Sequence, residues 1–413
     1  MISVAEASER ILERIGVLSQ ETVATGNAAG RVLAEPVVAQ VDSPPWDSSS
    51  MDGYAVRSED LSVVPVTLDV LEEIPAGAFP AHALAAGQSA RVMTGAPVPA
   101  GADTVIRHED TDDGRDRVTV LASRDRGKNI RRKGEDFRSG EKIFGAGEIL
   151  SIAHLGALAS SGITGVSVHR KPRVAIISSG DELVELGAFS RDLAGRKIVS
   201  SNSITLSALV RASGGEALDL GIATDDRASI REKLEAARVA DLIITSAGIS
   251  VGDHDHVRSA FDEIGGALDF WKVRMRPGAP LAFGMLGSTP WIGLSGNPVS
   301  AIVTFELFVR PAIRKMLGFS ALFRQTIPVK VENAMTLGAP LMHFLRVVVN
   351  RGPDGEYVAR LAGSQSSGVL TAMARSNALL ILSGDRTDVA AGETHRAMPL
   401  GDNLFDCDRL VLT

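Results

Sequence analysis

Apolar positions follow different spacings in different stretches of the chain. Behind a capping box formed by Ser3 and Glu6, apolar residues recur at helical spacing, which predicts a helix ending near Gly16. Residues 37–142 carry short alternating runs rich in Val, Thr, Pro and Gly, which is typical of a β-rich domain. Helical spacing returns at residues 152–160. We therefore expect a helical segment, residues 1–36 plus 143–170, that is interrupted by an inserted β domain.

Strand and helix signals alternate along residues 171–320. Strands are expected at residues 173–178, 217–223, 241–246, 269–273, 281–285 and 291–294, and helices at residues 203–212, 227–238, 257–264 and 299–317. This order predicts a mostly parallel α/β sheet covered by helices, with ligands bound beyond the carboxyl ends of its strands. Residues 321–413 again show short strand signals and predict a small C-terminal β-barrel-like domain. The expected fold class is multidomain α/β plus β.

Composition narrows the class of function. The 413 residues, 45% hydrophobic and 23% charged, suit several globular domains with sizeable cores. A net charge of −7 and an aromatic content of 4% argue against nucleic-acid binding. We see neither a signal peptide nor an apolar run of about 20 residues, so no membrane association is expected. The single cysteine, Cys407, lies between two aspartates and favours a cytoplasmic protein without disulfides.

Three loops at predicted strand ends combine small residues with polar ones: residues 178–182, 246–255 and 294–300. Small residues there expose backbone N–H groups, and carboxylates follow in the first two loops. This pattern indicates a phosphate-bearing ligand held together with a metal. The alternative for the acidic pair Asp181 and Glu182 is an ordinary helix start, where the helix dipole favours acids. Neither the P-loop nor the dinucleotide-binding fingerprint is present.

Residues 253–256, Asp-His-Asp-His, resemble a metal-binding sequence. A zinc site would require further Cys or His ligands, whereas carboxylates combined with phosphate oxygens suit Mg²⁺. We therefore favour Glu182 and Asp255 as magnesium ligands and leave His254 and His256 open. The alternative is a solvated loop that caps the following helix.

Positive charges alternate at Lys272, Arg274 and Arg276, just before a Pro-Gly turn. On a single strand these side chains would share one face, which is either a solvated surface or an anion site. Guanidinium groups bind tetrahedral oxyanions through paired hydrogen bonds, so the anion site is a real alternative.

Several further motifs are weak when each is taken alone, including those around Asp52, Thr94 and Asp136 and the loop at residues 363–367. Their order along the chain is much more specific. Together they closely resemble the molybdopterin molybdenumtransferases, the MoeA family that includes the gephyrin E domain, through residues 52–55, 93–96, 132–136, 179–182, 252–255, 276–278 and 296–300. The resemblance extends over nearly the whole chain.

The resemblance implies the last step of molybdenum cofactor synthesis. Molybdate is inserted into adenylylated molybdopterin with release of AMP, a divalent cation (Mg²⁺) assists, and the active cleft lies between two subunits of a homodimer. We also expect contacts with other cofactor-synthesis or molybdoenzyme-maturation proteins. The residues implied are catalytic Asp52, Thr94, Asp136, Glu182 and Asp255; pterin- or phosphate-binding Ser179, Gly180, Gly248, Gly252, Asn297 and Pro298; molybdate-binding Lys272, Arg276, Ser300, Arg346 and Ser367; and metal-binding Glu182, Asp255 and Asp225.

Two positions depart from the family pattern. Ala279 stands where the family often has Lys, and Ser295 stands where Pro is usual. Both changes affect the expected anion pocket, and they leave molybdate affinity and the choice between molybdate and tungstate open. Two other functions remain as alternatives: a molybdopterin adenylyltransferase, which needs neither the β insertion nor the C-terminal domain, and a gephyrin-like scaffold, which needs no clustered carboxylates.

Overall fold

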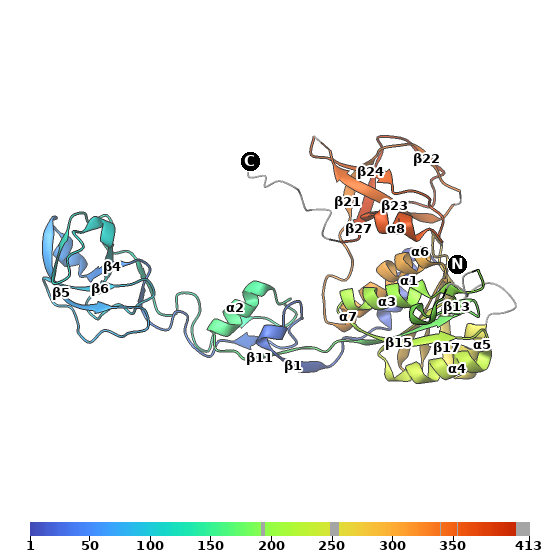
Figure 1. Cartoon of the computed structure of the whole chain (residues 1–413), viewed down its shortest axis with the longest axis horizontal. Coiled ribbons are helices and arrows are strands. Elements are labelled where there is room, and N and C mark those ends of the chain that lie inside the picture. Colours follow the sequence, from blue (N-terminus) through green and yellow to red (C-terminus); the bar gives the residue numbers. More distant parts are fainter. Residues whose placement is uncertain (191–194, 248–255, 339, 353, 402–413) are drawn as a thin grey trace. The chain divides into compact units, whose positions relative to one another are not determined.

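A computed structural model describes residues 1–190, 195–247, 256–338, 340–352 and 354–401 (Figure 1). The sequence-distant segments 1–20 and 169–413 together form one compact unit, and residues 21–168 form the other. None of the helices within the described ranges is both long enough and apolar enough to cross a membrane.

A six-stranded sheet forms the centre of the first unit. Its strands lie in the order β15 (Glu216–Ala223), β12 (Arg173–Ser179), β16 (Leu242–Ser246), β20 (Thr289–Leu294), β19 (Pro280–Leu286) and β17 (Gly266–Lys272). Neighbouring strands from β15 to β20 pair in parallel, and β19 runs against both of its neighbours. The mostly parallel sheet predicted from the sequence is therefore confirmed.

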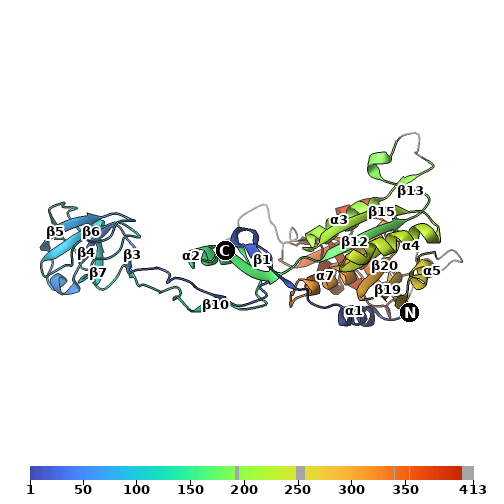
Figure 2. The same cartoon turned by 90° about the horizontal axis from the view of Figure 1, so that it is seen from below.

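Both faces of the central strands β12, β16 and β20 are buried, which explains why these strands are largely apolar. On β12, Val174 and Ile176 join the core shared with α1 (Val4–Glu13) and α3 (Ser201–Ala212). Their neighbours Ala175 and Ile177 join the core beneath α4 (Arg227–Ala236) and α5 (His256–Glu263) on the opposite face. Figure 1 shows α3 and α4 on opposite sides of β15 and β17, and Figure 2 shows the same elements turned by 90°.

The opening helix α1 packs in the first unit. The Ser3 hydroxyl accepts a hydrogen bond from the Glu6 backbone N–H at 3.1 Å, which satisfies one donor at the start of the helix. Ala7 and Ile11 are buried in the same core as Ile313 of α7 (Arg310–Met316). The structure thus places residues 1–20 with the α/β sheet, whereas the sequence grouped them with residues 143–170. The division into four domains stays a prediction.

The predicted single helix over residues 299–317 is interrupted. α6 (Pro298–Thr304) continues through a π-helical turn (Phe305–Val309) into α7. Pro311 explains the break, because it has no N–H to donate to the carbonyl four residues earlier. The Arg310 N–H instead bonds to the Phe305 carbonyl, five residues back.

The C-terminal strands close into a barrel, as the sequence predicted. The order is β23 (Met342–Arg351), β24 (Tyr357–Leu361), β21 (Ile327–Val331), β27 (Thr394–Pro399) and β25 (Ala378–Leu382), and β25 pairs again with β23. Closure removes exposed sheet edges and encloses an apolar core. The short strand β18 (Met275–Arg276) pairs with the beginning of β23, which joins the barrel to the α/β domain. The first unit also contains the short elements β13 (Leu183–Val184), β14 (Ile198–Val199), β22 (Met335–Thr336), α8 (Leu370–Arg375) and β26 (Asp388–Val389).

The second unit contains the predicted β insertion. Its five-stranded sheet has the order β7 (Thr104–Arg107), β4 (Gly53–Val56), β6 (Gln88–Val92), β5 (Val66–Ile74) and β8 (Arg117–Val120). A separate apolar cluster lies under α2 (Ile152–Ser160), where β1 (Gln20–Ala24) pairs with β11 (Gly165–His169). Short pairs complete the unit: β2 (Val37–Val38) with β10 (Lys142–Phe144), and β3 (Ser48–Ser49) with β9 (Ile130–Arg131).

Candidate functional site

Two adjoining cavities lie in the first unit, at the carboxyl ends of the parallel strands. The larger one, of about 850 Å³, lies between the α/β domain and the barrel. The smaller one, of about 680 Å³, lies among the loops that follow β12, β16 and β20. Pro280, Ser295 and Asn297 line both. We call them the cationic cavity and the serine cavity, after the side chains that line each.

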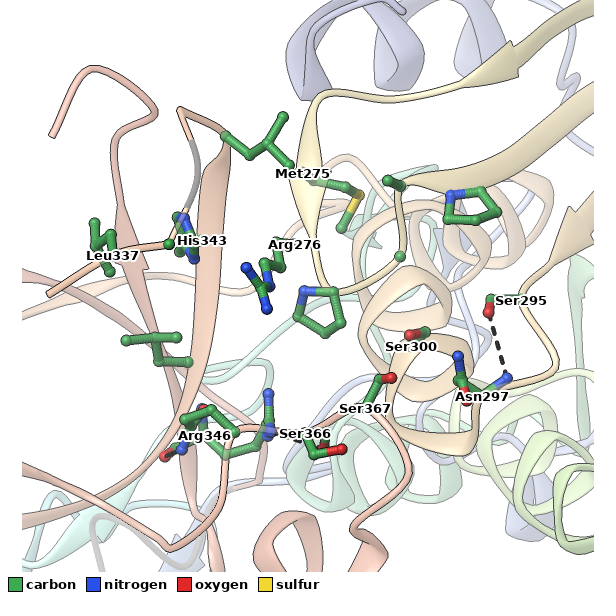
Figure 3. A pocket seen from close by; sticks show the side chains of 18 of the residues that line it. Met275, Arg276, Ser295, Asn297, Ser300, Leu337, His343, Arg346, Ser366 and Ser367 are labelled. Atoms are coloured by element: carbon green, nitrogen blue, oxygen red, sulfur yellow. Dashed lines mark hydrogen bonds between the residues drawn. The ribbon is translucent and has the colours of Figure 1, made fainter. Parts of the chain in front are cut away.

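The cationic cavity brings together four of the five residues predicted to bind molybdate. Arg276, Ser300, Arg346 and Ser367 all line it (Figure 3). Ser367 is held beside α6, because its carbonyl accepts the Val299 N–H at 3.1 Å. No Asp or Glu is found among the described residues that line this cavity. Two guanidinium groups and two hydroxyls therefore surround a space that suits an anion.

Arg346 is the most deeply buried cation of this cavity, with 1% of its surface exposed. One terminal nitrogen, Nη2, donates to the carbonyls of Ser364 and Ser366, each at 3.1 Å. Its Nε has no hydrogen-bond partner within the described ranges. Burial lowers the pKa of Arg346, yet a guanidinium keeps its charge at any physiological pH. An oxyanion would satisfy a buried donor of this kind.

Arg276 reaches the cavity because the chain leaves the sheet just before it. β17 ends at Lys272, and Arg276 lies on β18 opposite His343 of the barrel. The prediction that Lys272, Arg274 and Arg276 share one strand face is therefore wrong. Lys272 pairs with Pro280 at the end of β17 and lines neither cavity.

Gly278 shapes the turn that follows Arg276. Its φ is +97°, and a Cβ atom there would lie 2.5 Å from Thr304 Cγ2. We expect Gly278→Ala to lower the free energy of unfolding by about 2–4 kcal/mol, because backbone strain and a steric clash add. Gly265→Ala is the matched control, since Gly265 has a φ of +80° with nothing within 4 Å. Urea unfolding measures the free energy of unfolding of both variants. An equal loss of this free energy in Gly278→Ala and Gly265→Ala would show that the contact with Thr304 adds little to the backbone strain.

The serine cavity contains the first of the three predicted loops. Ser179, Glu182, Asn297 and Pro298 line it, as predicted for a pterin or phosphate site. The Ser179 hydroxyl is buried without a hydrogen-bond partner in the described part of the chain. Gly180 lies next to Glu182, since a Cβ atom at Gly180 would come within 2.7 Å of the Glu182 carboxylate. No Lys, Arg or His occurs among the described lining residues, so this cavity has the opposite electrostatic character to its neighbour.

The predicted metal ligands Glu182, Asp225 and Asp255, and the glycines predicted beside them, differ in whether the structure describes them. Gly248, Gly252 and Asp255, together with His254, lie outside the described residues. Asp225 faces Asp181, whose carboxylate accepts the Asp225 N–H at 3.0 Å. Within the described ranges, no group of three His, Cys, Asp or Glu side chains could hold a metal by itself. Among the described residues, Glu182 is thus the one carboxylate that lines either the cationic or the serine cavity.

Asp52 and Thr94 meet in the second unit. The Asp52 carboxylate accepts hydrogen bonds from the Thr94 backbone N–H at 2.6 Å and from the Thr94 hydroxyl at 2.8 Å. These bonds hold the pKa of Asp52 below its usual value, so the group is a carboxylate at neutral pH. Asp136 lies on a separate turn, where its N–H donates to the Ser43 carbonyl at 2.9 Å.

Asn202 is a lining residue that the sequence did not single out. It lies in the first turn of α3, within the run of residues 200–203, Ser-Ser-Asn-Ser. That run shows only the usual signal of a helix start, because Ser and Asn favour such positions. The structure places Asn202 in the wall of the serine cavity, together with Ser200 and Ser246.

Comparison with known proteins gives concordant results over the whole chain. Family models match residues 2–162 ("MoeA N-terminal region (domain I and II)"), 175–315 ("Probable molybdopterin binding domain") and 328–400 ("MoeA C-terminal region (domain IV)"). A molybdopterin molybdenumtransferase of Nostoc sp. is 39% identical, over 89% of this chain and 85% of the relative. Molybdopterin molybdenumtransferase 2 of Mycobacterium tuberculosis is 38% identical, over 95% and 98%. The crystal structure of a molybdopterin biosynthesis moeA protein from Pyrococcus horikoshii OT3 has a TM-score of 0.80 at 31% identity, covering 97% of this chain and 100% of that one.

Proposed function

The chain belongs to the MoeA family of molybdopterin molybdenumtransferases, and from this premise we propose that it inserts molybdate into adenylylated molybdopterin and releases AMP. One observation carries the proposal: a cationic cavity and a serine cavity share the wall formed by Pro280, Ser295 and Asn297. A bound oxyanion and a bound phosphorylated pterin would therefore lie side by side, as a transfer between them requires.

In this proposal the cationic cavity holds molybdate. Molybdate is a tetrahedral dianion, so it matches two guanidinium groups and two hydroxyls that converge on one space. Arg346 is positioned before the ligand arrives, because the carbonyls of Ser364 and Ser366 fix one edge of its guanidinium group. Ala279 supplies no charge. Apart from His343, the cationic side chains among the described lining residues are therefore Arg276 and Arg346.

The serine cavity holds the phosphorylated part of the substrate together with Mg²⁺. Its lining contains Glu182 but no cationic side chain within the described residues, so a pyrophosphate would meet only negative charge there. This donor set fits Mg²⁺, which commonly binds one or two carboxylates together with substrate phosphates. When bound, the ion neutralises phosphate charge. Glu182 holds it, and the unpartnered Ser179 hydroxyl contacts the substrate.

We further propose that the protein is a homodimer in which Asp52, Thr94 and Asp136 act on the substrate bound by the partner subunit. The apolar surface of α2 supports association. Ile152 is 77% exposed, Ala153 and Gly156 are exposed beside it, and Ile149 is 44% exposed just before the helix. Apolar side chains clustered on a surface are typical of protein–protein interfaces.

The single cysteine is consistent with a cytoplasmic location.

Ile152→Asp is expected to weaken the dimer at least about tenfold, because a charge would be buried in an apolar interface. Val239→Asp is the control, since Val239 is also exposed, at 59%, but lies in the first unit. Sedimentation equilibrium measures both dissociation constants. A dimer unaffected by Ile152→Asp would exclude α2 from the interface.

The alternative function, adenylylation of molybdopterin, is separated from this proposal by its co-substrate. The purified protein should form active cofactor from adenylylated molybdopterin, molybdate and Mg²⁺ without ATP, as measured by activation of a cofactor-free molybdoenzyme. A requirement for ATP, with unmodified molybdopterin as the consumed substrate, would instead identify an adenylyltransferase.

A further inference from the structure

Asn202 connects helix α3 to two of the three loops that form the serine cavity, those after β16 and β20. From the first turn of α3, its Nδ2 donates to Ser246 Oγ at 2.7 Å and to the Gly296 carbonyl at 2.8 Å. Ser246 ends β16, and Gly296 lies between β20 and α6. The side chain is 9% exposed and lines the cavity.

The orientation of the Asn202 amide follows from these contacts. The Gly296 carbonyl can only accept a hydrogen bond, so the amide atom beside it must be the nitrogen. Both protons of Nδ2 are then used, and Oδ1 is left as a buried acceptor. Among the described residues, neither Asn202 Oδ1 nor the Ser179 hydroxyl of the same cavity has a hydrogen-bond partner.

An acceptor-only atom selects a particular ligand chemistry. The Asn202 oxygen repels phosphate oxygens, which are also acceptors, and it attracts N–H and O–H groups. Glu182 adds a second acceptor to the cavity wall, and no described lining residue adds a cation. Part of this cavity is therefore suited to a neutral hydrogen-bond donor, in contrast to the predicted phosphate cradle.

We propose that Asn202 Oδ1 and the Ser179 hydroxyl bind a neutral N–H or O–H donor of the substrate, and that Asn202 is thereby a specificity-determining residue. The inference rests on the proposed function, whose substrate offers two such donors: the amino-substituted pterin ring and the ribose hydroxyls of the adenylyl group. The phosphates then lie elsewhere in the cavity, towards Glu182 and its metal.

A purely structural role is the competing explanation, since the two Nδ2 bonds alone would fix the loops. The two roles differ in what they predict for ligands. A structural Asn202 affects every ligand equally when it is removed. An Asn202 that binds a donor affects only ligands that carry that donor, because a buried acceptor without a partner is costly.

The test is a double-mutant cycle between protein and ligand, measured by calorimetric titration with Mg²⁺ present. One arm compares 6-hydroxymethylpterin with its analogue methylated on the ring N–H and the exocyclic amine. The other arm compares AMP with 2′,3′-dideoxy-AMP. The proteins are the wild type, Asn202→Ala, and Ser207→Ala as the matched control, because Ser207 is buried on the same helix α3 but lines neither cavity.

We expect wild type and Ser207→Ala to prefer the donor-bearing ligand of one arm on the order of tenfold, and Asn202→Ala to lose that preference. The arm that shows coupling identifies the pterin or the ribose as the bound group. Preferences that are absent from the wild type, or unchanged by Asn202→Ala in both arms, would overturn the inference. Failure to bind any of the probes would count against the proposed function itself, so the two failures are distinguishable.

Discussion

Arg346→Ala is expected to reduce kcat/KM for molybdate roughly 100-fold, equivalent to about 2.7 kcal/mol of lost transition-state stabilisation. Arg346 is the buried cation of the cationic cavity, and its Nε has no partner among the described residues. The loss arises because a desolvated guanidinium contributes both charge and directional donors to a tetrahedral oxyanion. Steady-state AMP release at varied molybdate concentration measures the effect.

The barrel also depends on Arg346, so the variant needs a control for folding. Its side chain donates hydrogen bonds to the carbonyls of Ser364 and Ser366. Loss of these two hydrogen bonds will also lower the free energy of unfolding. Arg346→Lys keeps the positive charge but loses the planar guanidinium group with its paired N–H donors. We therefore expect an activity between those of wild type and Arg346→Ala. Arg360→Ala is the matched surface control, because Arg360 is an exposed residue on the neighbouring strand β24. Near-normal molybdate dependence in folded Arg346→Ala would remove Arg346 from the oxyanion site.

Glu182→Gln is expected to lower turnover at least about 100-fold while leaving the fold near normal. Glu182 lines the serine cavity, where the described residues provide no cation to balance substrate phosphates. Removing the carboxylate charge weakens the bound Mg²⁺, so part of the activity should return at high Mg²⁺ concentration. Activity is measured as AMP release across a Mg²⁺ titration, and thermal unfolding reports on the fold.

Glu185→Gln is the matched control for this change. Glu185 is an exposed acid three residues further along that lines neither cavity, so its loss should leave the Mg²⁺ dependence unchanged. If Glu182→Gln and Glu185→Gln behave alike, the magnesium assignment to Glu182 is wrong.

The fold was largely predictable because its signals are local. Continuous apolar runs bounded by small residues marked β12, β16 and β20, and short alternating runs marked strands of the β insertion. The π turn Phe305–Val309 was missed because an unbroken helical pattern of apolar residues does not show where a hydrogen bond shifts from four residues back to five. The packing of α1 was missed because amphipathic spacing shows that a helix has a partner without identifying it.

The sequence predicted many of the residues of the candidate site, but it predicted their positions in space less well. Arg276 and Arg346 were named through the family resemblance, and the structure brings them to one cavity from two strands, β18 and β23. Lys272 was wrongly aligned with Arg276, because sequence spacing does not reveal where a chain leaves its sheet. Asn202 gave no functional signal, since the same residue type is common at helix starts, and only its contacts show an acceptor without a donor.

In the proposed reaction, molybdate drives release of AMP from the adenylylated pterin. This step is tested most directly by incubating the protein with adenylylated molybdopterin and Mg²⁺ and measuring AMP with and without molybdate. We predict that AMP is released only when molybdate is present, with one AMP formed for each active cofactor. Absence of molybdate-dependent AMP release from well-folded wild-type protein would contradict the account.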